Sequence, residues 1–165
     1  MAALDDFNDG PADQAVQALR ACNAAPRFAV ELVAGRPYPD AETLVARAEE
    51  VARALPWEEV SVALAAHPRI GDRVDGASTE AAASRREQSS MAQADADTRT
   101  ALLDGNRAYE KRFGHVFLIR AAGRSPEQML AELRRRLDND DEAERAEATE
   151  QLAQITALRV KGMVS

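Results

Sequence analysis

The sequence predicts an all-α fold, and three observations support this class. Alanine, the best helix former, is very abundant along the chain. Signals for the start and end of helices recur from Gly10 onward, and the apolar residues between them follow helical spacing. One short apolar run, residues 117–119, can be extended, but we find no second strand-like segment to pair with it.

Four helices are expected in the first part of the chain. Their signals are Pro11 at a first helical position, Gly35 after a helix over residues 27–34, Asp40 as an N-cap, and Pro56 as the start of a new helix. The fourth helix must end near His67, because Pro68 disfavours helical backbone in the residue before it.

Four further helices are expected after a loop that holds Gly71 and Gly76. They span about residues 79–91, 97–112, 126–137 and 141–163. The third begins with a capping box, since Ser125 is followed by Pro and by Gln128. The acidic cluster at residues 138–142 indicates a solvated turn and a favourable negative start for the last helix. We find no repeat or linker, so residues 1–165 are expected to form a single domain.

The composition excludes several classes of protein. The net charge of −7 repels phosphate backbones and argues against a nucleic-acid partner. A single cysteine, Cys22, cannot form an internal disulfide, which fits a reducing cytosol. No apolar run approaches the roughly 20 residues that span a bilayer, and the N-terminus lacks the features of a signal peptide. We therefore expect a soluble cytoplasmic protein with no membrane contact.

His67 is the first candidate functional residue. It lies at a predicted helix end, where the partial negative charge of the helix C-terminus favours a protonated imidazole. Such a group suits a general acid. An exposed or satisfied histidine near a turn gives the same pattern, so this alternative stays open.

A polar helix face is the second candidate. On the helix predicted over residues 79–91, Ser84, Glu87 and Gln88 share one face with Met91, whereas Arg85 and Arg86 point elsewhere. The shared face offers a hydroxyl, a carboxylate and an amide together. A simple solvent face explains the same pattern without any function.

Arg159 is the third candidate, because it falls on an apolar stripe of the last helix with Leu152 and Ile155. A buried arginine suggests an anionic partner, either a carboxylate side chain or a ligand. The alternative is a side chain whose charged end reaches water.

Metal and cofactor chemistry finds little support in the sequence. The two histidines, His67 and His115, do not form a metal-binding spacing, and no glycine-rich loop fits a nucleotide. Cys22 has no histidine nearby in the sequence, so a packing role explains this residue more simply than a nucleophilic role does. We expect neither a metal nor an organic cofactor.

Taken together, these features resemble one enzyme family. The chain is similar to 2-oxo-4-hydroxy-4-carboxy-5-ureidoimidazoline (OHCU) decarboxylases. The matching segments keep the family's order and close to its spacing, and they are residues 28–38, 67–71, 84–88, 109–114, 117–121 and 158–159.

The resemblance implies a small, all-helical, usually dimeric enzyme that decarboxylates OHCU to (S)-allantoin in urate breakdown without a cofactor. It implies that His67 donates or shuttles the proton, with Glu87 beside it. Substrate contacts are then expected from Pro68, Ser84, Arg85, Arg86, Glu87, Gln88, Phe117, Leu118, Ile119, Arg120, Ala121 and Arg159. The segment of residues 117–121 is expected to contribute main-chain contacts, and no fused transthyretin-like hydrolase is expected in this chain.

One departure from the family and two rival functions stay open. Arg120 replaces a small residue inside the apolar run. If only its main chain contacts the substrate, the side chain points away harmlessly; if the side chain points inward, it adds a positive charge to the pocket and changes its geometry. A helical binding module without chemistry explains the polar face of residues 84–88. A related decarboxylase or lyase acting on another ureido or imidazoline compound is the third possibility.

Overall fold

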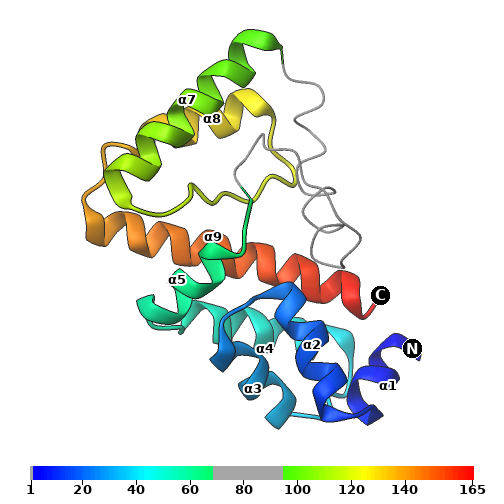
Figure 1. Cartoon of the computed structure of the whole chain (residues 1–165). Coiled ribbons are helices and arrows are strands. Elements are labelled where there is room, and N and C mark those ends of the chain that lie inside the picture. Colours follow the sequence, from blue (N-terminus) through cyan, green and yellow to red (C-terminus); the bar gives the residue numbers. More distant parts are fainter. Residues whose placement is uncertain (1, 69–94) are drawn as a thin grey trace. The chain divides into compact units, whose positions relative to one another are not determined.

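The computed structural model of the chain describes residues 2–68 and 95–165, and these residues form helices joined by short connections (Figure 1). No strand occurs within these two ranges, so the all-α class is confirmed. The helices described are α1 (Ala2–Asp9), α2 (Ala12–Cys22), α3 (Pro26–Ala34), α4 (Ala41–Arg53), α5 (Trp57–Ala65), α7 (Ala96–Phe113), α8 (Pro126–Arg136) and α9 (Asp141–Met163). The helix predicted over residues 79–91 lies outside the described residues.

The chain divides into two compact units. The first holds Met1–Ala63 with Leu152–Ser165, and the second holds Leu64–Gln151. The long helix α9 contributes its first part to the second unit and its last part to the first. The expected single domain over residues 1–165 stays a prediction.

The predicted helix ends rest on local hydrogen bonds. The Asp40 side chain accepts a hydrogen bond from the Thr43 amide at 2.7 Å and caps α4. The hydrogen bond also holds the pKa of the Asp40 carboxyl below its usual value. Ser125 and Gln128 form the predicted capping box at the start of α8. Our placement of Pro11 was wrong by one residue: it is the N-cap of α2, because its ψ of 142° is not helical.

Helix α1 was not predicted from the sequence. Among its side chains from residue 3 onward, Leu4 and Phe7 are the buried ones, so its apolar stripe is short. Contacts from a distant part of the chain hold it instead. The Arg36 guanidinium donates to the Phe7 carbonyl at 2.9 Å, and the Asn8 amide exchanges two hydrogen bonds with the backbone of Tyr38. A pattern search along one segment cannot detect such contacts.

In the first unit, α3 packs against both α2 and α4. Aliphatic and aromatic side chains fill its core, and the fully buried ones include Leu19, Phe28, Leu32 and Leu44. A buried polar contact in that core joins the Asn23 amide to the Thr156 hydroxyl at 3.1 Å. Because this amide and hydroxyl are paired, their burial costs little.

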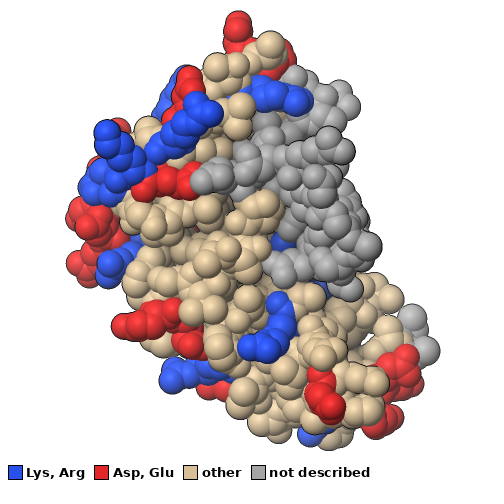
Figure 2. All heavy atoms as spheres, in the orientation of Figure 1, with Lys and Arg blue, Asp and Glu red and all other residues tan. Residues whose placement is uncertain are grey.

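In the second unit, α7 packs against α8 over a separate apolar cluster. Its buried members are Leu102, Tyr109, Phe117, Ile119, Ala121, Met129 and Leu133. Gly105 allows the two helices to approach, because a methyl group there would overlap the Leu133 side chain. Acidic and basic side chains lie next to one another on the outside of this unit (Figure 2, upper left). None of the described helices is long and apolar enough to cross a membrane.

Candidate active site

His67 follows directly on the end of α5. Its amide donates to the Leu64 carbonyl at 3.0 Å, which closes a final turn, and Pro68 then leads the chain away. The predicted helix end is therefore confirmed. His67 is buried, with only 8% of the residue exposed, so an exposed histidine is excluded, whereas a satisfied histidine near a turn stays an alternative. Pro68 is half-buried.

The polar face of residues 84–88 cannot be compared with this geometry. Ser84, Arg85, Arg86, Glu87 and Gln88 all lie outside the described residues. Their roles beside His67 stay predictions.

Residues 117–121, which we call the 117–121 segment, lie in the same unit as His67. The segment forms neither helix nor strand, and no strand pairs with it among the described residues. Phe117, Leu118, Ile119 and Ala121 are buried, whereas Arg120 is partly exposed. An apolar loop of this kind needs partners for its backbone groups, because an unpaired buried amide or carbonyl is costly.

Two side chains from other elements supply such partners. The Arg136 guanidinium of α8 donates to the Leu118 carbonyl at 2.8 Å, and the Gln151 side-chain oxygen of α9 accepts from the Arg120 amide at 2.8 Å. The guanidinium Nε of Arg120 is buried and makes no hydrogen bond within the part of the chain that the structure describes. Two main-chain groups of the segment are thus held by side chains of α8 and α9.

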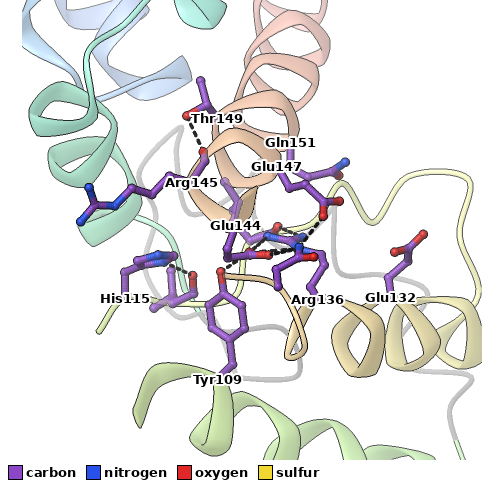
Figure 3. A network of polar contacts seen from close by, with 12 residues as sticks. Tyr109, His115, Glu132, Arg136, Glu144, Arg145, Glu147, Thr149 and Gln151 are labelled. Carbon is purple, nitrogen blue, oxygen red and sulfur yellow. Dashed lines mark hydrogen bonds and ion pairs between the residues drawn. The ribbon is translucent and has the colours of Figure 1, made fainter. Parts of the chain in front are cut away.

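Arg136 belongs to a buried polar network that the sequence analysis missed. Its Nε lies 3.1 and 3.0 Å from the two carboxylate oxygens of Glu144, and the Tyr109 hydroxyl donates to the same carboxylate (Figure 3). The guanidinium also lies over the Phe117 ring, with its carbon 4.6 Å from the ring centroid. Burial and the bond to Glu144 raise the pKa of Tyr109 above its usual value.

A signal for this network was present in the sequence. Arg136 continues the buried stripe of Met129 and Leu133 on α8, at a spacing of three and four. Glu144 lies one turn before Ala148 on the same stripe of α9 that made Arg159 a candidate. Two opposite charges on facing apolar stripes indicate a buried ion pair.

Arg159 is buried in the first unit, with 8% of the residue exposed. Its guanidinium donates to the Ala21 carbonyl of α2 at 3.2 Å. This burial favours an arginine with protein partners over a side chain whose charged end reaches water. The predicted contact with substrate stays a prediction.

Cys22 and His115 have packing roles. Cys22 is buried, and its thiol lies 3.5 Å from the Ala18 carbonyl in the preceding turn. The His115 ring meets the Tyr109 ring edge-on at 5.5 Å between centroids. Among the described residues, no three His, Cys, Asp or Glu side chains cluster in a way that can hold a metal ion.

Known proteins resemble the chain over most of its length. The model of the OHCU decarboxylase family matches residues 8–161. A solved OHCU decarboxylase, crystallised in the presence of (S)-allantoin, superposes with a TM-score of 0.74 at 25% identity, covering 88% of this chain and 95% of the other. A solved (S)-allantoin synthase shares the fold, with a TM-score of 0.70 at 17% identity, covering 98% of this chain and 54% of the other.

Curated relatives point the same way. The 2-oxo-4-hydroxy-4-carboxy-5-ureidoimidazoline decarboxylase of Amia calva is 28% identical over 141 residues, which are 84% of this chain and 81% of that protein. The uric acid degradation bifunctional protein TTL of Arabidopsis thaliana is 29% identical over 155 residues, covering 88% of this chain and 46% of that protein.

The fold and these likenesses define a helical carboxy-lyase. More specifically, the chain belongs to the OHCU decarboxylase family.

Proposed function

We propose that this protein decarboxylates OHCU to (S)-allantoin in urate degradation, without a metal or organic cofactor. The family match over residues 8–161, which include His67, carries the proposal. The likeness to a solved OHCU decarboxylase supports it over 95% of that chain's length.

The reaction needs electron acceptance and one controlled protonation. Loss of CO2 leaves an electron pair on the carbon that held the carboxylate, and the neighbouring ring C=N bond can accept this pair. The ring nitrogen takes up one proton with this pair, which gives an enol. The enol then makes two proton transfers, because it loses its hydroxyl proton and gains one proton on the former C=N carbon. Delivery of that proton to one face gives a single enantiomer.

We assign both proton transfers to His67. A positioned acid–base group typically accelerates a reaction about 10²–10⁴-fold. Glu87 is proposed to orient His67 and stabilise its charged form, as a neighbouring carboxylate does. Burial of His67 supports this assignment, since a shielded imidazole transfers its proton to a bound substrate rather than to bulk water.

The proposed substrate contacts come from three parts of the sequence. Pro68 follows His67, and Ser84, Arg85, Arg86 and Gln88 accompany Glu87. The 117–121 segment is proposed to use its main chain, which fits the hydrogen bond already made by the Arg120 amide. Position 120 can then hold the long side chain of arginine, where the family resemblance implies a small residue.

A stereochemical assay tests the function. OHCU is generated in situ from urate with urate oxidase and the hydrolase, the protein is added, and (S)-allantoin is followed by near-ultraviolet circular dichroism. We expect rapid growth of the signal, and its near loss in His67→Ala with unchanged helicity. The matched control is His115→Gln, which removes the other imidazole and should keep turnover. A wild-type trace equal to the uncatalysed baseline would refute the proposal.

Three finer points are proposed with it. A homodimer is proposed from the family resemblance, and light scattering should then give twice the chain mass of 17.9 kDa. A cytoplasmic location is proposed from the single buried cysteine. The net charge of −7 supports the absence of a nucleic-acid partner.

A further inference from the structure

The 117–121 segment raises a question of orientation. The segment lies outside helices and strands, so the hydrogen bonds of those elements do not hold its peptide groups. A loop that binds a substrate nevertheless needs its donors and acceptors in fixed orientations. The two side-chain contacts described above lie on either side of one residue, Ile119. The Leu118 carbonyl belongs to the peptide group before Ile119, and the Arg120 amide belongs to the peptide group after it.

Peptide geometry and these two contacts together determine the directions of the Ile119 N–H and C=O. Both peptide bonds are trans, because the cis bond found in the described chain is Arg36–Pro37. In a planar trans peptide the C=O and the N–H point in opposite directions. The Ile119 N–H therefore points away from Arg136, and the Ile119 C=O points away from Gln151. One donor and one acceptor of the segment are aimed by residues outside it.

Arg136 is itself held in place. Glu144 engages its Nε, and the Phe117 ring lies under its guanidinium. The side chain of Arg136 is 2% exposed and that of Glu144 is not exposed, so solvent does not weaken the pair. A planar guanidinium in such a setting has little freedom to rotate. Figure 3 shows Glu144 between Tyr109 and Arg136, with hydrogen bonds to both.

We propose that Arg136, held by Glu144, and Gln151 are positioning residues that orient the peptide groups of Ile119 toward the substrate. This inference rests on the proposed function, in which the main chain of the 117–121 segment contacts OHCU. None of the three side chains needs to touch the substrate. Their role is to keep one N–H and one C=O in a fixed direction before the substrate arrives.

Gln151→Met is the first test, because it removes the acceptor while keeping the length of the side chain. We expect KM for OHCU to rise about 3- to 10-fold with kcat nearly unchanged, as for the loss of one hydrogen bond that supports binding in ground and transition states alike. The matched control is Gln17→Met on the exposed side of α2, which should keep the wild-type KM. Hydrogen exchange of the Arg120 amide should be faster in Gln151→Met alone.

Arg136→Lys is the second test, with its neighbour Arg135→Lys as control. Lysine keeps the charge but cannot place donors on both Glu144 and the Leu118 carbonyl in one plane. We expect a raised KM in Arg136→Lys beyond any loss of folded protein measured by urea titration. Arg135 pairs with Glu147 on the exposed side of the same two helices, so Arg135→Lys should change neither KM nor the stability to urea.

The outcomes separate this inference from the function beneath it. A wild-type protein that turns over OHCU, with an unchanged KM in Gln151→Met, would overturn the positioning role and leave the function intact. An activity loss in Arg136→Lys that only follows the fraction unfolded would also overturn it. If the wild-type protein fails to consume OHCU, the proposed function is refuted. Hydrogen exchange of the Arg120 amide in Gln151→Met then still tests whether Gln151 orients the segment.

Discussion

Two arginine–glutamate pairs join α8 to α9, one on the inner side of the contact and one on the outer side. Arg136 meets Glu144 inside, where the side chains are 2% and 0% exposed. Arg135 meets Glu147 outside, where they are 54% and 32% exposed. Adjacent residues on one helix thus make the same chemical contact in opposite surroundings.

The difference between the two pairs lies in what each can contribute. Water and salt screen the outer pair, so its contribution to stability is small. The inner pair has lost its hydration, and it recovers this cost only through a full set of partners. Tyr109 and the Leu118 carbonyl complete that set. The inner pair therefore specifies the position of a loop, whereas the outer pair mainly adds charge to the surface.

Glu144→Ala should have the largest effect on stability. It leaves the Arg136 guanidinium buried without its carboxylate, and removal of one partner of a buried pair costs about 3–5 kcal/mol. Glu147→Ala, one turn away, should cost under about 1 kcal/mol. Urea unfolding of both variants measures the contrast. Equal losses would mean that burial does not distinguish the pairs.

A shared neighbour must be considered in that comparison. The Asn139 side chain lies 3.2 Å from Glu144 and also donates to Glu147. The two pairs are therefore not fully independent, and mutations in contact with a common residue need not add. A double-mutant cycle of Glu144→Ala with Glu147→Ala measures this coupling directly.

The sequence predicted the helices well but not the buried ion pair of Arg136 and Glu144, and the two pairs show why. Helix ends depend on residues close in the chain, such as Asp40 with Thr43, so local patterns reveal them. In the run of three arginines, the spacing from Met129 and Leu133 singles out Arg136, but it does not show which residue pairs with it. Only the facing stripes of α8 and α9 decide this, and a stripe becomes visible when its partner helix is known. The same limit hid α1, which depends on Arg36.

Tyr109→Phe should have the next largest effect. It removes the hydroxyl that donates to Glu144 but keeps the ring that packs on Phe117 at 5.3 Å between centroids. Hydrogen bonds to charged groups contribute about 1.5–3 kcal/mol, and we expect a loss in that range because Arg136 still pairs the carboxylate. Denaturant unfolding checks the value. A loss below about 0.5 kcal/mol would show that the carboxylate is satisfied without Tyr109.

Alkaline pH should weaken the inner side of the contact in particular. The pKa of Tyr109 is raised in the folded state, so its contribution is present below the unfolded value near 10 and is lost as the pH rises above it. Stability should fall by up to about 1.4 kcal/mol per pH unit above pH 10 for this group. Burial also raises the pKa of Tyr38, so this residue contributes to the fall in the same direction. Tyr109→Phe should make the alkaline fall shallower, and an identical slope would contradict the assignment.

Acid and salt should act on the outer pair, with the smallest effect. The hydrogen bond from Arg135 holds the pKa of Glu147 below the usual 4.5, so its stabilisation is present above that value and is lost as the pH falls below it. Because the pair is partly exposed, Arg135→Ala should cost only about 0.2–1 kcal/mol at neutral pH, and less in 1 M salt. Thermal unfolding at pH 7 and pH 3, at low and high salt, measures both trends. If the stability lost in Arg135→Ala is the same at low and high salt, Arg135 acts through packing of its aliphatic stem on α9 rather than through its charge.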